Sequence, residues 1–179
     1  MTKSHHIVRC GALATTLGGA AFVAEGLLYL TAERALQDLL LALAYILVAA
    51  GLIGFHEIQR GRLRLSGRLG FDAAIVGWAV ALVGHTASLE AVHGLGFAIA
   101  LVGYLLYGIA SFRGRVIPRW SGAAIAVAGP LSLLVGEYTT VVFGLLWVVL
   151  GYALWSEAAR GAAAGTAPGG ADLRASARA

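Results

Sequence analysis

The sequence predicts an all-α membrane protein, a polytopic bundle of six transmembrane helices with both termini in the cytoplasm. Hydrophobic residues make up 59% of the 179 residues and charged residues 12%, whereas a soluble domain carries about 25% charged residues. Several apolar runs reach the roughly 20 residues that a helix needs to cross a hydrocarbon core of about 30 Å. Nearly all basic residues lie in alternate connections between these runs or at the two ends of the chain. The solvent around this fold is therefore lipid.

The apolar runs place the spans along the chain. The first run could be mistaken for a secretory signal, but it is longer than a signal core, contains Glu25 and leads into another span, so we expect it to be retained. The predicted spans are residues 11–30, 36–55, 69–88, 92–112, 120–136 and 139–155. We expect residues 1–10 to be a cytoplasmic amino end and residues 11–157 to be the transmembrane domain. Residues 158–179, which are small, polar and glycine-rich, are expected to be a disordered cytoplasmic tail.

The positions of the basic residues predict the orientation. Apart from Arg34, every Lys and Arg lies at the amino end, in the second or fourth connection, or after the last span. Short loops rich in Lys and Arg stay in the cytoplasm, so both termini are predicted to be cytoplasmic. The same pattern explains the net charge of +4 without a nucleic-acid partner. We expect the loop arginines to contact lipid headgroups or partner proteins; they are Arg60, Arg62, Arg64, Arg68, Arg113, Arg115 and Arg119.

Glycines spaced by seven residues predict how the helices pack. Examples are Gly11 with Gly18, and Gly70 with Gly77 and Gly84. Seven residues are close to two helical turns, so each set lies on one face of its helix. Lipid supplies no hydrophobic drive for helix association, and small residues allow the close van der Waals contact that replaces it. We therefore expect a compact, mostly left-handed bundle.

A small set of ionisable residues lies near the non-cytoplasmic ends of the spans. A charge at the bilayer centre costs roughly 2.5 to 3.5 kcal/mol or more, so Glu25, inside the first span, invites a functional hypothesis. His85, Glu90 and His93 surround the third connection, and Glu137 follows the fifth span. One interpretation is that all five are ordinary helix ends. The other is a site, with Glu25 or Glu137 as acid or base and His85, His93 and Glu90 as ligands of a divalent metal.

Motifs that would strengthen a metal or cofactor site are absent from the sequence. His85 and His93 do not have the i, i+4 spacing of a strong helical metal motif, and no P-loop, HExxH or GxSxG sequence occurs. Cys10 is the only cysteine, which excludes an intramolecular disulfide and a CxxC motif. We expect no cofactor, with a divalent metal left open.

Three segments carry a resemblance to a protein family. They are FHEIQRGRLRLSGRLGF at residues 55–71, FRGRVIPRWSGAAIAV at 112–127 and GLLWVVLGYALWSEAAR at 144–160. With six spans, the chain resembles small six-helix integral membrane proteins of actinobacteria and related bacteria, whose function is not established. The resemblance implies a bacterial plasma-membrane protein. It carries over no catalytic residue.

The sequence leaves several functions open. The first is a non-enzymatic accessory, sensor or small permeation module whose partners are membrane lipids, other membrane proteins or a second copy. The second is an intramembrane enzyme acting on a lipid or isoprenoid-like substrate. Transport of a hydrophilic solute is disfavoured because the midplane is nearly all apolar. The deep aromatic residues are interpreted as helix packing, with a lipid-like pocket as the other interpretation; they are Trp78, Tyr104, Tyr107 and Trp147.

Overall fold

The computed structural model describes residues 3–29, 31, 33–115, 117–134 and 138–166. These ranges contain α-helices joined by short connections and no strand, so the all-α prediction is confirmed. The helices are α1 (Lys3–Leu28), α2 (Arg34–Gln59), α3 (Leu65–Thr86), α4 (Glu90–Gly114), α5 (Arg119–Leu134) and α6 (Thr139–Thr166).

Among the residues that the structure describes, five helical stretches are long and apolar enough to cross a membrane. They are His6–Leu28, Arg34–Gln59, Leu65–Thr86, Glu90–Gly114 and Thr139–Arg160. The described part of α5 has 16 residues, which corresponds to about 24 Å at 1.5 Å per residue. The predicted span at residues 120–136 ends among residues 135–137, which lie outside the described residues, so a sixth span stays a prediction.

The helices at the two chain ends extend beyond the predicted spans. α1 begins at Lys3, within the expected amino end, and α6 continues past Glu157 to Thr166. The added segment of α6 is rich in alanine, which has the highest helix propensity, and contains arginine, which is also a good helix former. A helix is also free to project past the hydrocarbon layer into water. Residues 167–179 of the expected tail lie outside the described residues.

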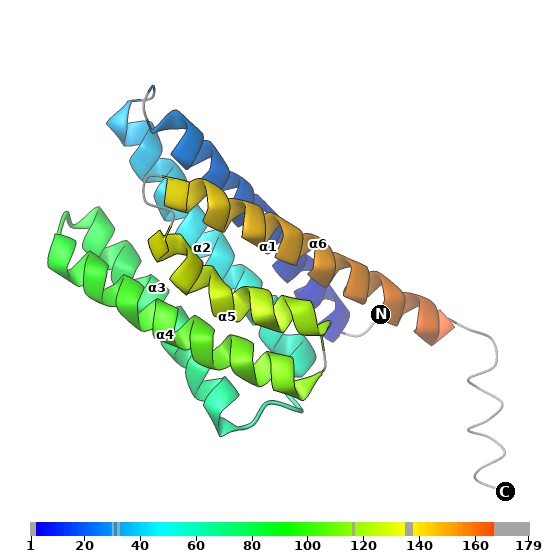
Figure 1. The fold of residues 1–179 in the computed structure, drawn as a ribbon. Helices are drawn as coiled ribbons and strands as arrows, with labels where there is room; N and C mark the ends of the chain where they lie inside the picture. Colours follow the sequence, from blue (N-terminus) through cyan, green and yellow to red (C-terminus); the bar gives the residue numbers. More distant parts are fainter. Residues whose placement is uncertain (1–2, 30, 32, 116, 135–137, 167–179) are drawn as a thin grey trace, which may run out of the picture.

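The helices form two groups. α1 packs along both α2 and α6, whereas α3 packs along α4, and α5 packs on α4. Figure 1 shows α6 lying alongside α1, and α3 alongside α4. We call α1, α2 and α6 lobe A, and α3, α4 and α5 lobe B. The lobes meet over shorter stretches, mainly where α2 touches α3 and where α5 touches α6.

Glycines make the close contacts within each lobe. A Cβ atom added at Gly77 would overlap the amide nitrogen of Ala100, and one added at Gly96 would overlap that of Ala81. The backbones of α3 and α4 therefore touch directly, as expected for small-residue contacts in lipid. Further glycines where an added Cβ would come closer than 3.0 Å to backbone atoms of a neighbouring helix are Gly11, Gly19, Gly54, Gly70, Gly84, Gly103, Gly108, Gly122, Gly144 and Gly151. The predicted role of glycine spacing is confirmed.

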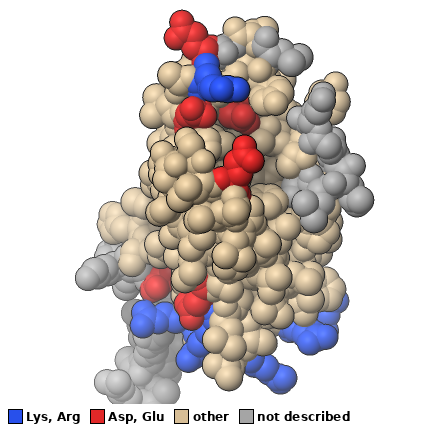
Figure 2. Space-filling view, turned by 90° about the vertical axis from the view of Figure 1, so that its left-hand side faces the viewer, with Lys and Arg blue, Asp and Glu red and all other residues tan. Residues whose placement is uncertain are grey.

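Charged side chains separate to the two ends of the bundle. Figure 2 shows Lys and Arg gathered at its lower end with some acidic groups beside them, mainly Asp and Glu with one basic group at its upper end, and an uncharged belt between. Large apolar side chains are exposed on the helices, including Leu39, Val102 and Leu145. We call the first end the arginine-rich end, formed by Arg60 to Arg68, Arg113 to Arg119, Arg9 and Arg160. We call the second the acidic end, formed by Glu33, Arg34, Asp38 and Glu90.

Aromatic side chains fill the centre and join the two lobes. Trp78 and Tyr104 of lobe B meet Phe143 and Trp147 of α6, and all four are almost completely buried. Ring centroids are 6.0 Å apart for Trp78 and Phe143, and 5.4 Å apart for Tyr104 and Trp147. The Trp78 indole N–H donates a hydrogen bond to the Tyr104 hydroxyl. The packing interpretation of these residues, and of the fully buried Tyr107, is confirmed.

Candidate functional site

The turn between α3 and α4 brings two histidines together at the acidic end. α3 ends at Thr86, and Ser88 adopts a left-handed conformation with φ 56°. The Leu89 N–H then donates to the Gly84 carbonyl oxygen at 2.8 Å, as at other helix C-termini closed by a left-handed residue. Because this turn is tight, the rings of His85 and His93 lie with their centroids 5.8 Å apart. Their predicted convergence is confirmed.

A carboxylate from the other lobe faces His85. Asp38 Oδ1, on α2, lies 3.7 Å from His85 Nε2, and the two form an ion pair when the imidazole is protonated. Asp38 is 59% exposed at its side chain, whereas that of His85 is 18% exposed. Asp38 is not among the site residues predicted from the sequence. Its position just inside an apolar run, like that of Glu25 in the first span, is the signal that could have identified it.

Glu25 is buried close to the same cluster. The residue is 7% exposed, and its side chain hydrogen-bonds with that of Thr140 on α6. Its Oε2 atom has no hydrogen-bond partner among the described residues. It also lies near enough to His85 for an electrostatic interaction. Glu25 therefore belongs to the cluster as predicted, whereas Glu137 lies outside the described residues.

His93 occupies the centre of this region. Its Nδ1 atom lies 3.0 Å from the Ala81 carbonyl oxygen. A carbonyl oxygen only accepts hydrogen bonds, so Nδ1 carries the proton and the Nε2 atom of the neutral ring remains an acceptor. One face of the ring stacks against Tyr45 of α2, with centroids 6.0 Å apart and planes 26° apart. His93 is thus held from both lobes.

Two adjoining cavities share His93. The first, which we call the polar vestibule, has a volume of about 380 Å³. It is lined by Arg34, Asp38, Gly84, His85, Ser88, Glu90 and His93. The second, which we call the aromatic pocket, has a volume of about 250 Å³ and lies between the lobes. It is lined by Phe22, Leu41, Tyr45, Trp78, His93, Phe97, Thr139, Thr140 and Phe143.

The two cavities differ in chemistry. The aromatic pocket is almost wholly apolar and suits a hydrocarbon chain or ring, while the vestibule offers charges of both signs and hydrogen-bonding groups. Of the four deep aromatic residues, Trp78 lines the aromatic pocket as well as packing in the core, so both interpretations from the sequence apply to it. The pair of Asp38 and His85 is the kind of arrangement that can hold or transfer a proton.

The vestibule contains the residues that the sequence predicted as metal ligands. His85, Glu90 and His93 line it together. Over the described ranges, however, no group of three His, Cys, Asp or Glu side chains is placed to hold a metal ion. The predicted ligands His85, Glu90 and His93 therefore share a cavity, but the described residues do not form a set that could hold a metal ion.

The predicted lipid-contacting arginines are divided in the structure. Arg60 lies 4.0 Å from the Glu57 carboxylate, and the Arg119 guanidinium sits 5.9 Å from the centre of the Phe112 ring. Arg68 and Arg115 are exposed. The remaining three line one cleft at the arginine-rich end; they are Arg62, Arg64 and Arg113.

No protein-family model, curated protein or solved structure matches this chain. The resemblance to small six-helix bacterial membrane proteins therefore stays a prediction. Function is inferred from the geometry of the aromatic pocket and the polar vestibule.

Proposed function

We propose that this chain is an integral protein of a bacterial plasma membrane that binds an amphipathic, lipid-like molecule between its lobes without transforming it. The observation that carries this proposal is that His93 lines both the aromatic pocket and the polar vestibule. An apolar chain in the pocket would place its polar head beside His93, Asp38 and Arg34. Such a protein acts as an accessory or sensor subunit, because its conformation responds to an occupied pocket between two lobes.

The proposed orientation places the arginine-rich end in the cytoplasm. This follows from the positive-inside rule and puts both chain termini on the same side. The vestibule then lies at the opposite leaflet, where a membrane lipid or isoprenoid-like molecule reaches it from the bilayer.

The centre of the bundle favours binding over permeation. Trp78, which lines the aromatic pocket, packs against Tyr104, and Tyr104 packs against Trp147. All three side chains are 0–1% exposed. A polar solute would have to displace this layer to cross. A molecule bound in the pocket therefore cannot pass through the bundle without displacing these side chains.

The test is to block the pocket and measure bound molecules. Leu41 lines the pocket, so Leu41→Trp fills part of its volume. Leu39, on the same helix, is 64% exposed, so Leu39→Trp adds the same side chain outside the pocket. We expect native mass spectrometry of protein purified in detergent to show a retained lipid-like molecule in the wild type and in Leu39→Trp, and its loss in Leu41→Trp. Equal retention in all three, or no retained molecule in the wild type, would contradict the proposal.

A second candidate is an intramembrane enzyme that acts on the same class of molecule. It is favoured by the Asp38 and His85 pair beside the buried carboxylate of Glu25. The assay is incubation of the purified protein with a membrane lipid extract, followed by mass spectrometry of the products. A product made by the wild type and lost in His85→Gln, with the ligand still retained, supports this candidate. If the ligand is retained and no product forms, the result supports binding alone.

A further inference from the structure

A cleft at the arginine-rich end has the properties of a second, separate binding site. Its volume is about 530 Å³. One wall is basic and consists of Arg62 and Arg64 from the α2–α3 connection with Arg113 from α4. Another wall is apolar and includes Leu106 and Ile109, which lie on a helix long enough to cross a membrane. The cleft is therefore both basic and apolar.

The α2–α3 connection presents its arginines at the start of a helix. Leu63 is 6% exposed and anchors the connection, while Arg62 and Arg64 on either side of it are exposed. α3 begins at the next residue, and no side chain caps this N-terminus. The first N–H groups of a helix lack partners within the helix and carry partial positive charge. Ser66, in this first turn, also lines the cleft.

The basic wall has no built-in counter-charge. The lining of the cleft contains no Asp or Glu. Within the described part of the chain, no ion pair is found for Arg62, Arg64 or Arg113, whereas Arg60 and Arg160 each have a carboxylate partner. Guanidinium groups that share one cleft repel one another unless an anion lies between them.

We propose that this cleft binds an anionic phospholipid of the cytoplasmic leaflet. The phosphate lies against Arg62, Arg64 and Arg113, because guanidinium groups bind phosphate oxygens in a bidentate manner. One acyl chain lies along Leu106 and Ile109 of α4. The apolar wall distinguishes a lipid from free phosphate, which would gain nothing from it. The site is at the opposite end of the bundle from the aromatic pocket and does not depend on what the pocket binds.

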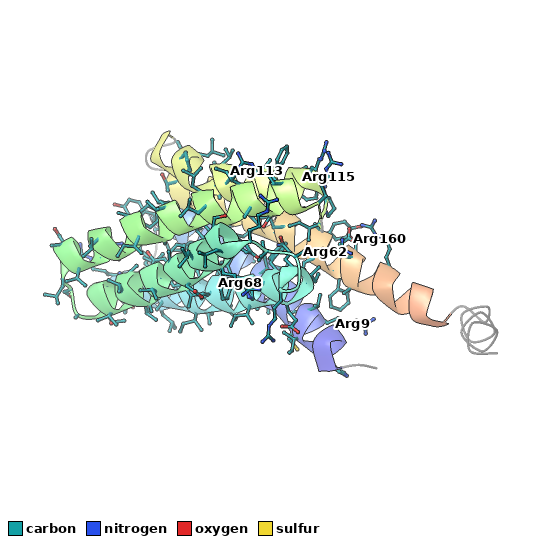
Figure 3. All side chains as sticks on the ribbon, turned by 90° about the horizontal axis from the view of Figure 1, so that it is seen from below. Arg9, Arg62, Arg68, Arg113, Arg115 and Arg160 are labelled. Atoms are coloured by element: carbon teal, nitrogen blue, oxygen red, sulfur yellow. The ribbon has the colours of Figure 1, made fainter. Side chains whose placement is uncertain are left out.

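The chain offers a matched pair of control arginines. Figure 3 shows Arg9 and Arg160 on α1 and α6, and Arg62 and Arg113 on the α2–α3 connection and α4. Both control side chains have partners within the protein. The Arg9 guanidinium lies 5.7 Å from the centre of the Trp155 ring, and Arg160 Nη2 lies 2.6 Å from Glu157 Oε1. Removing these two charges changes the net charge at this end as much as removing two from the cleft.

The experiment compares lipid binding by native mass spectrometry of the full chain in detergent. Phosphatidylglycerol is the anionic probe and phosphatidylcholine the neutral one. We expect the wild type to prefer phosphatidylglycerol. Arg62→Gln with Arg113→Gln is expected to weaken that binding about 30-fold, the effect of two surface arginines. Arg9→Gln with Arg160→Gln is expected to leave it within about threefold.

Three results would overturn the proposal. Equal loss in both double variants would mean general attraction to a basic surface. Equal binding of the two lipids by the wild type would remove the anionic specificity. Displacement of the lipid by millimolar inorganic phosphate would indicate a site for a free anion.

Arg62→Lys with Arg113→Lys keeps the charge and is expected to show a smaller loss than the Gln variant, which separates phosphate recognition from misfolding. Retention of a molecule in the aromatic pocket is measured in the same spectra, so failure of either site is seen separately.

Discussion

His93 Nδ1 lies 3.0 Å from the carbonyl oxygen of Ala81, and this contact ties the first turn of α4 to α3. The carbonyl fixes which ring nitrogen carries the proton, and Tyr45 covers one face of the ring. The orientation of the residue shared by the two cavities is therefore set by the backbone of lobe B and by a side chain of lobe A.

The contact predicts a difference between two substitutions of His93. His93→Ala removes the donor to Ala81, and we expect a loss of about 1 kcal/mol in the free energy of unfolding. His93→Asn places an amide N–H near the position of Nδ1 and is expected to lose less. Thermal unfolding in detergent, compared between the two variants, measures this. Equal destabilisation would show that the ring, and not the hydrogen bond, is what matters.

Two neighbouring glycines of α4 should respond oppositely to alanine. A Cβ at Gly96 would overlap the backbone of Ala81, so Gly96→Ala is expected to destabilise the protein by about 1 to 3 kcal/mol. Nothing lies within 4 Å of a Cβ at Gly94. Gly94→Ala is therefore expected to be neutral or to stabilise by up to about 1 kcal/mol, because alanine favours a helix. Similar melting temperatures for both variants would refute the close packing of α3 on α4.

The hydrogen bond between Trp78 and Tyr104 predicts a measurable coupling. Trp78→Phe removes the donor and leaves a smaller aromatic ring, while Tyr104→Phe removes the acceptor and keeps its ring. In a double-mutant cycle we expect the two changes to be non-additive by about 0.6 kcal/mol, with an upper range of about 1.7 kcal/mol, as for other hydrogen bonds in membrane proteins. Strictly additive effects on the free energy of unfolding would mean that the bond contributes nothing to stability.

The pairing of Asp38 with His85 predicts a measurable coupling between the lobes. Asp38 Oδ1 lies 3.7 Å from His85 Nε2, so Asp38→Asn and His85→Gln are expected to be non-additive in a double-mutant cycle. We expect a value below about 1 kcal/mol, because Asp38 is 59% exposed and solvent screens the pair. Strictly additive effects of the two substitutions on the free energy of unfolding would exclude an ion pair.

Local patterns predicted much of this fold. Composition and the length of the apolar runs predicted an all-α membrane protein. The seven-residue spacing of glycines such as Gly70, Gly77 and Gly84 predicted their contacts, because it depends only on helix periodicity. The nearness of His85 and His93 was also predictable, because a short turn joins their helices.

Contacts between the lobes could not be read from the sequence. Asp38 meets His85 only because α2 of lobe A packs against α3 of lobe B. In a soluble bundle, an apolar stripe would indicate which face of a helix is buried. Here the helices are apolar on all sides, so no such stripe exists, and the aromatic pocket that forms between the lobes has no pattern in the sequence.

The pairing of the first helix with the last has a consequence for biogenesis. Gly19 of α1 packs directly on Gly144 of α6, yet α6 begins about 110 residues after α1 ends. At about 5 to 20 residues per second, the ribosome needs roughly 5 to 20 seconds to make the intervening chain. During that interval the glycine face of α1 lacks the helix that covers it in the complete fold. A nascent chain interrupted before α6 therefore leaves Gly19 without its packing partner Gly144.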